Sequence, residues 1–137
     1  MKSGIFVIGL FLILNSAGCA GTKECLRGFM GISTKVLEDN RASALAKSFN
    51  YDYVTCYNKA LDILKESGSY VYAGDISKYM VAVYLSEADT TPVGIFFSET
   101  DKDNTRLEVS SPSTYGKEVI AAKVFGGLEK LSSSEKE

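Results

Sequence analysis

The sequence predicts a two-layer α+β domain, in which one face of an antiparallel sheet is covered by two helices. Apolar residues recur at helical spacing in residues 53–66 and again in residues 120–131. Between these two stretches, apolar residues alternate with polar or small ones over several short segments. The expected order of elements is β-α-β-β-β-β-α, an arrangement that places both helices against the same sheet.

The first strand is expected over residues 42–49 and is followed by the clearest helix of the chain. Asn50 is placed to cap this helix, and Asp52 then lies in its first turn, where a negative charge is favourable. Gly68 stands where a helix normally ends. One helix face collects Tyr53, Tyr57, Ala60, Leu61 and Leu64.

Beyond Gly68 the apolar period changes from 3.6 to 2, which predicts strands. They are expected at residues 70–73, 78–86, 92–98 and 106–110, and residues 101–104 form a hairpin turn. In the second of these strands one side is formed by Tyr79, Val81, Val83 and Leu85.

The last helix is expected to begin at Ser113 or Thr114, since either residue can cap it. Its apolar stripe consists of Ile120, Val124, Leu128 and Leu131. Gly126 and Gly127 weaken the helix and predict a kink or fraying. Residues 132–137 are polar and are expected to be a disordered tail.

The second face of the predicted sheet carries apolar side chains that need cover. Met80, Tyr84 and Phe96 fall on this face and would be poorly placed in water as a cluster. Two kinds of cover are considered: a segment of the same chain with Leu26, Phe29 and Met30, or a partner protein. Cover by the chain itself is favoured over cover by a partner protein. Single exposed aromatic residues are common, so their presence does not require a partner.

The N-terminus has the organisation of an export signal. Lys2 is followed by an apolar run over residues 5–14, and then by the small residues that precede Cys19. A cysteine directly after Ala17 and Gly18 is typical of bacterial lipoproteins, in which the thiol receives a diacylglycerol and the chain is cut before it. Two acyl chains or more anchor a protein durably.

Two other interpretations of this segment were weighed. Ordinary cleavage after Ala20 would give a secreted protein, and no cleavage would give a membrane anchor. The strongly apolar part spans about ten residues, whereas a spanning helix needs about 20. Ser16 departs from the usual lipoprotein site, but lipidation of Cys19 remains the favoured prediction. The expected divisions are a signal peptide (1–18), a lipidated tether (19–40), the α+β domain (41–131) and the tail (132–137).

Composition argues against several classes of function. Fifteen basic and seventeen acidic residues leave no basic stripe for nucleic acid. The chain has no histidine, so the commonest general base and metal ligand is missing. The acidic residues in 99–108 lack the glycine and glutamate spacing of a calcium loop. We therefore expect no catalytic residues, no metal site and no cofactor, and hence no enzyme.

Cys25 and Cys56 have two interpretations. In an oxidising compartment they form a disulfide, which would close a loop of about 30 residues and stabilise the fold by roughly 3–4 kcal/mol. Alternatively, Cys56 is a small apolar residue on a helix and Cys25 a free residue of the tether. The sequence leaves both open.

These features together resemble a group of small, uncharacterised bacterial envelope lipoproteins that carry a strand-helix-four-strand-helix domain of unknown function. The resemblance rests on the Ala-Gly-Cys19 site, the helix over residues 53–66, and the stretch 91–131. At the level of fold the layout is also similar to helix-grip domains of envelope lipoproteins.

The resemblance implies a non-enzymatic protein that is anchored by lipid and acts through protein contacts or structural support. Ala20 after the cysteine implies the outer membrane, with the domain facing the periplasm and an envelope protein as partner. The alternative is a ligand-binding module that holds a small apolar molecule or lipid between sheet and helix.

Overall fold

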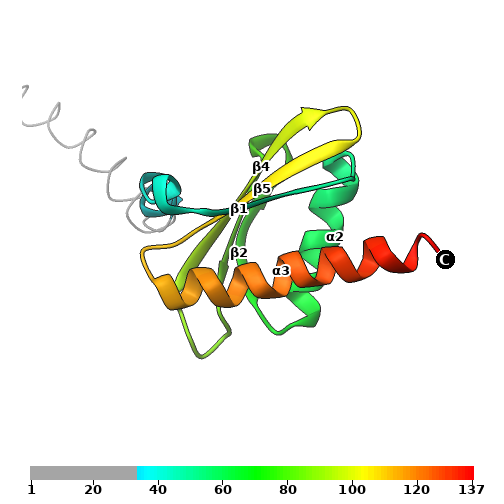
Figure 1. Ribbon diagram of the computed structural model, residues 1–137. Helices are drawn as coiled ribbons and strands as arrows, with labels where there is room; N and C mark the ends of the chain where they lie inside the picture. Colours follow the sequence, from blue (N-terminus) through cyan, green and yellow to red (C-terminus); the bar gives the residue numbers. More distant parts are fainter. Residues whose placement is uncertain (1–33) are drawn as a thin grey trace, which may run out of the picture. The chain divides into compact units, whose positions relative to one another are not determined.

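Five antiparallel strands form one sheet in the computed structural model, which describes residues 34–137 (Figure 1). The strands are β1 (Leu45–Phe49), β2 (Tyr70–Asp75), β3 (Met80–Tyr84), β4 (Pro92–Asp101) and β5 (Asn104–Ser110). Their spatial order is β1-β5-β4-β3-β2, so β2 to β5 form the predicted meander and β1 pairs with β5.

Two long helices, α2 (Tyr53–Glu66) and α3 (Thr114–Ser134), pack against one face of this sheet. The strand side chains that point toward them are Val81, Val83, Val93, Ile95, Phe97, Leu107 and Val109, all buried. They meet Ala60 and Leu64 of α2 and Ile120, Val124 and Leu128 of α3. The predicted two-layer α+β fold is therefore confirmed.

The start of α2 corrects the predicted helix cap. Asp52, not Asn50, is the N-cap, because its carboxylate accepts a hydrogen bond from the Thr55 N–H at 3.0 Å. The end is as predicted: Gly68 has a φ of +83°, a left-handed conformation that glycine adopts without strain.

The second half of α3 also differs from expectation. The helix runs without a break through Gly126 and Gly127 to Ser134, so residues 132–134 are helical and not part of a disordered tail. A Cβ on Gly127 would lie 2.7 Å from Ile63 Cδ1, so this glycine permits a close approach between α3 and α2. The Lys59 ammonium of α2 also donates to Glu135 at 2.7 Å, just past the helix end.

Two strands begin later in the sequence than predicted. The first strand begins at Leu45 because residues 41–43 form a 3-10 turn, η1 (Arg41–Ser43). The third begins at Met80, because Tyr79 ends the turn η2 (Ile76–Lys78) with a left-handed φ of 56°. Its ring does not join the inward row of the strand but stacks on Tyr53, with the ring centroids 4.1 Å apart.

The hairpin between β4 and β5 is the predicted polar turn. Asp101 accepts hydrogen bonds from the Asp103 N–H at 2.9 Å and from the Asn104 side-chain amide at 2.8 Å. These bonds explain the local density of acidic and amide residues without a bound cation.

The N-terminal boundary of the domain lies earlier than predicted. The compact unit begins at Ser33, and residues 34–39 form a helical segment followed by η1. Residues 34–40, expected in the tether, therefore belong to the domain. The predicted signal peptide (1–18), Cys19 and Cys25 lie outside the described residues.

Candidate functional site: the outer face of the sheet

The face of the sheet opposite α2 and α3, here called the outer face, is the candidate functional surface. Side chains alternate along a strand, so the residues between the core positions point to this face. Glu108 pairs across the strands with Phe96, and Phe96 with Met80, which places all three in one row. A neighbouring row contains Ser110, Gly94 and Ala82.

Residues 34–41, here called the strap, lie on this face. The Leu37 side chain is fully buried and forms a small apolar cluster with Ala82 and Phe96, separate from the main core. Tyr72, Ala73 and Met80 pack against the cluster. Burying a leucine completely is worth about 1.5–3 kcal/mol, so Leu37 is the main apolar contact of the strap.

The sheet is shaped to receive Leu37 by Gly94 of β4. A Cβ on this glycine would stand 3.0 Å from Leu37 Cβ and 3.1 Å from Leu37 Cδ1. These distances are shorter than nine in ten real Cβ contacts, so a larger residue would force Leu37 to shift by a few tenths of an ångström. A glycine inside a strand often marks such a close approach.

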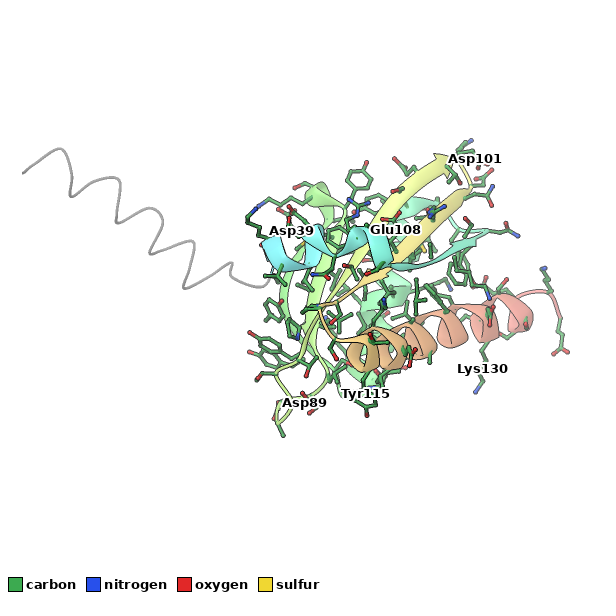
Figure 2. All side chains as sticks on the ribbon, turned by 60° about the vertical axis from the view of Figure 1, so that its left-hand side comes forward. Asp39, Asp89, Asp101, Glu108, Tyr115 and Lys130 are labelled. Atoms are coloured by element: carbon green, nitrogen blue, oxygen red, sulfur yellow. The ribbon has the colours of Figure 1, made fainter. Side chains whose placement is uncertain are left out.

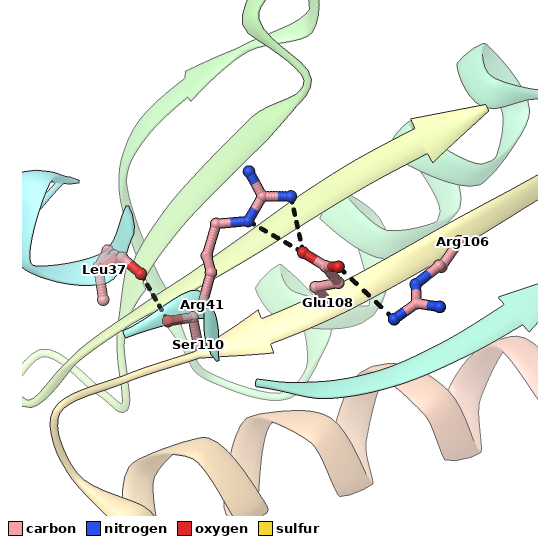
Figure 3. A network of polar contacts seen from close by, with 5 residues as sticks. All are labelled: Leu37, Arg41, Arg106, Glu108 and Ser110. Atoms are coloured by element: carbon pink, nitrogen blue, oxygen red, sulfur yellow. Dashed lines mark hydrogen bonds and ion pairs between the residues drawn. The ribbon is translucent and has the colours of Figure 1, made fainter. Parts of the chain in front are cut away.

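Polar contacts hold the strap at Leu37 and at Arg41 (Figure 3). The buried Ser110 hydroxyl donates to the Leu37 carbonyl oxygen at 2.5 Å. Arg41 Nε and Nη2 both donate to Glu108 Oε2, at 2.9 and 2.7 Å, while Arg106 Nη2 lies 3.6 Å from Glu108 Oε1. Glu108 thus lies between two guanidinium groups, one from the strap and one from its own strand.

Arg41 also contacts the aromatic surface. Its guanidinium carbon lies 4.5 Å from the centroid of the Phe96 ring, a cation–π geometry. At the C-terminal end of the strap helix, the Asn40 side-chain amide donates to the Val36 carbonyl oxygen at 2.8 Å, and the same oxygen accepts the Asn40 backbone N–H at 3.2 Å. Figure 2 shows Asp39 and Glu108 close to this crossing of strap and sheet.

Three tyrosines, here called the tyrosine row, continue the outer face toward the β2 edge. Tyr84 lies between the other two, with ring centroids 4.2 Å from Tyr72 and 6.2 Å from Tyr70. The rings are nearly parallel, at 24° and 10°. Tyr70 is 47% exposed, and the other two are half-buried, so the row presents aromatic surface to solvent.

The sequence identified the apolar character of this face and favoured cover by the N-terminal segment of the same chain. Leu26, Phe29 and Met30, the predicted cover, lie outside the described residues. Among residues 34–137, Leu37 provides cover, and sequence reasoning had assigned it to the tether. Gly94 in the interior of an apolar strand was the available signal, because it indicates that another part of the chain approaches closely.

The interior between sheet and helices is filled by side chains. Val81, Val83, Ile95, Leu107 and Val124 all have no exposed surface. An open groove of about 500 Å³ lies instead at the end of β1 beside α3, lined mainly by polar groups including Lys47 and Glu129, which form an ion pair. This packing gives no support to an apolar ligand held between the two layers.

The reactive groups of the described part of the chain are few. Residues 34–137 contain no group of three or more histidine, cysteine, aspartate or glutamate side chains that could hold a metal ion. Cys56 lies in the main core with no exposed surface, and it has no disulfide partner among residues 34–137. Burial, and to a smaller extent the charge of Asp52, raises the pKa of this thiol to about 12, so it remains protonated and inert at neutral pH.

The candidate residues from the sequence therefore do not lie together on the outer face. Cys56 lies on the helix side of the sheet, whereas the strap crosses the outer face. Its predicted disulfide partner Cys25 and the predicted lipid site Cys19 are not among the described residues, so both assignments stay predictions.

Within residues 34–137 no helix is both long enough and apolar enough to cross a membrane. Neither the models of known protein families nor the curated proteins include a match to this chain.

Proposed function

We propose that this chain is a lipid-anchored protein of the bacterial cell envelope that acts through contacts with another protein and not by catalysis. The anchor rests on the sequence: the basic, apolar and small-residue order of positions 2–18 leads directly to Cys19. With Ala20 after the cysteine, the proposed location is the outer membrane with the domain in the periplasm.

The observation that carries the proposed mode of action is the tyrosine row on the outer face. Tyrosines are enriched at protein interfaces, where they supply a large contact area with few rotatable bonds. The row is stacked and partly exposed, and Tyr72 packs against the buried cluster of Leu37, Ala82 and Phe96. Aromatic residues are enriched at protein-binding surfaces, whose core is poor in charged residues.

The strap supports a link between this surface and the anchor. Leu37 of the strap lies on the outer face and follows Cys19 by 18 positions in the sequence. The ligand-binding alternative has less support, because side chains occupy the space between the sheet and the helices.

Site-specific photo-crosslinking in intact cells tests the proposal. A photoreactive phenylalanine analogue replaces Tyr70 in one strain and Tyr115 in a control strain. Tyr115 is also an exposed tyrosine, 68% accessible, but it lies on α3 (Figure 2). We expect one discrete adduct with an envelope protein from position 70 and none from position 115.

The same strains separate the two parts of the proposal. With Cys19→Ala added, the adduct should disappear and the protein should leave the membrane fraction. Equal adducts from positions 70 and 115 would contradict a contact through the tyrosine row. Unchanged membrane fractionation of Cys19→Ala would contradict the lipid anchor.

A further inference from the structure

The strap is attached to the domain by contacts that are distinct from those of the main core. Leu37 belongs to a small cluster with Ala82 and Phe96, whereas the main core between sheet, α2 and α3 contains no residue of the strap. The sheet itself is completed without the strap, because β1 pairs with β5 along its whole length. Loss of the strap contacts therefore leaves the two packed layers intact.

Few groups of the strap are buried. Leu37 is the one fully buried side chain among residues 34–41, and Lys35, Glu38, Asp39 and Arg41 are exposed. The ion pair of Lys35 with Asp39 is internal to the strap, with side-chain exposures of 82% and 64%. It does not tie the strap to the sheet.

The ion pair between Arg41 of the strap and Glu108 of the sheet is also accessible to water. The Arg41 side chain is 41% exposed, and solvent and salt screen such ion pairs strongly. The strap is also held by the burial of Leu37, by the hydrogen bond from Ser110 to its carbonyl oxygen and by the contact of Arg41 with the Phe96 ring. Segments with so few buried contacts open locally more often than the domain unfolds.

We infer that the strap is detachable: it leaves the outer face while the sheet, α2 and α3 stay folded, and its release uncovers an apolar site formed by Ala82, Gly94 and Phe96. Ala82 has no exposed surface and Phe96 only 6% when the strap is in place. The outer face therefore has a closed form and an open form, and the open form extends the aromatic surface of the tyrosine row.

Release has a second consequence, which rests on the proposed lipid anchor. The freed residues would join the tether, and each extended residue adds up to about 3.3–3.6 Å of reach. The eight residues of the strap would add up to roughly 26–29 Å at full extension. The distance of the domain from the membrane and the exposure of the apolar site would then change together.

Thiol labelling tests detachment, because the chain contains its own control. In the full-length chain in detergent, Cys19→Ser and Cys25→Ser leave Cys56, and Ala82→Cys adds a probe under the strap. Cys56 reports unfolding of the main core, and the residue at position 82 reports the outer face. Alkylation of each position is followed by mass spectrometry at increasing urea concentration.

We expect position 82 to be alkylated at least tenfold faster than Cys56 without urea, with a weak dependence on urea, because local opening exposes little surface. A further substitution, Val124→Ala, loosens only the main core. It should accelerate labelling of Cys56 and change that of position 82 by less than twofold. The inference would be overturned if both cysteines were alkylated at equal rates with equal dependence on urea, and if Val124→Ala changed both rates by the same factor.

Hydrogen exchange of the unsubstituted chain provides a check that needs no variant. The backbone N–H of Asn40, which donates to the Val36 carbonyl oxygen, should exchange at least tenfold faster than the backbone N–H of Phe97 in β4. Equal protection of the two amides would also overturn detachment. Neither experiment depends on lipid, so their failure is distinguishable from failure of the proposed anchor.

Discussion

Gly94 and Leu37 lie so close together that a Cβ on residue 94 would stand 3.0 Å from the Cβ of Leu37. They are 57 positions apart in the sequence, and their contact fixes where the N-terminal part of the domain crosses the sheet. A single hydrogen atom as side chain at position 94 is what allows the strap to lie flat on β4.

Gly94→Ala should therefore destabilise the protein by about 1–3 kcal/mol, the usual cost of overpacking a filled site. The loss is expected in the free energy of unfolding measured with urea. Because the added methyl group presses on the strap, labelling of a cysteine at position 82 should also become faster.

Gly126→Ala is the matched control for this substitution. A Cβ on Gly126 meets no atom within 4 Å, and the residue lies inside α3. Alanine favours a helix over glycine by about 0.5–1 kcal/mol, so this variant should be more stable than the parent. Destabilisation by both variants, or by neither, would contradict the described packing around Leu37.

The ion pair between Arg41 and Glu108 should contribute little to stability. A double-mutant cycle with Arg41→Gln and Glu108→Gln is expected to give a coupling free energy of at most about 1 kcal/mol, since the arginine side chain is 41% exposed to solvent. The coupling should fall further in 1 M salt. A coupling several times larger that persists in salt would mean that the strap is held mainly by charge.

Two residues near the start of α2 distinguish the observed helix cap from the predicted one. Asp52→Ala removes the hydrogen bond to the Thr55 N–H and should cost about 0.5–2 kcal/mol of stability. Asn50→Ala should change stability by less than about 0.5 kcal/mol, the usual range for a surface position. Urea unfolding of the two variants decides between these caps.

Stability should decrease in alkaline solution because of two buried groups. Burial raises the pKa of Cys56 from 9.0 to about 12 and that of Tyr53 from 10.0 to about 12. The unfolded chain releases these protons first, so the unfolded state gains stability as the pH rises from about 9 to 12. At pH 8 and below, both groups are protonated in the folded and the unfolded state, so they have almost no effect on stability.

Urea unfolding at pH 8, 9.5 and 11 measures this decrease. In Cys56→Ala the overall stability is lower, but its fall between pH 8 and 9.5 should be smaller than in the parent. If the free energy of unfolding fell equally with pH in the parent and in Cys56→Ala, the thiol would not contribute to the decrease as expected.

The alternation of apolar residues was sufficient to predict the sheet, because Val93, Ile95 and Phe97 of β4 need no information beyond their spacing. The helix periods were equally sufficient for α2 and α3. Local boundaries were less predictable: Asn50 and Asp52 are both good caps, and only the backbone path decides which carboxylate or amide meets the Thr55 N–H.

The outer face could be predicted only in part, because its cover comes from a distant segment. Leu37 shares the near-helical spacing of Leu26, Phe29 and Met30, but its burial depends on Gly94 and Phe96 of another element. The effect of Gly126 and Gly127 also depends on a distant segment. Glycines weaken an isolated helix, but Gly127 leaves room for Ile63 of α2, which a Cβ would not.

The identity of the processed N-terminus is the most direct test of the proposed anchor. Mass spectrometry of the native protein from membranes should find a chain that begins at Cys19, with a diacylglycerol on its sulfur and an acyl group on its amine. An N-terminal peptide that is unmodified at Cys19, or that still begins at Met1, would contradict the central claim.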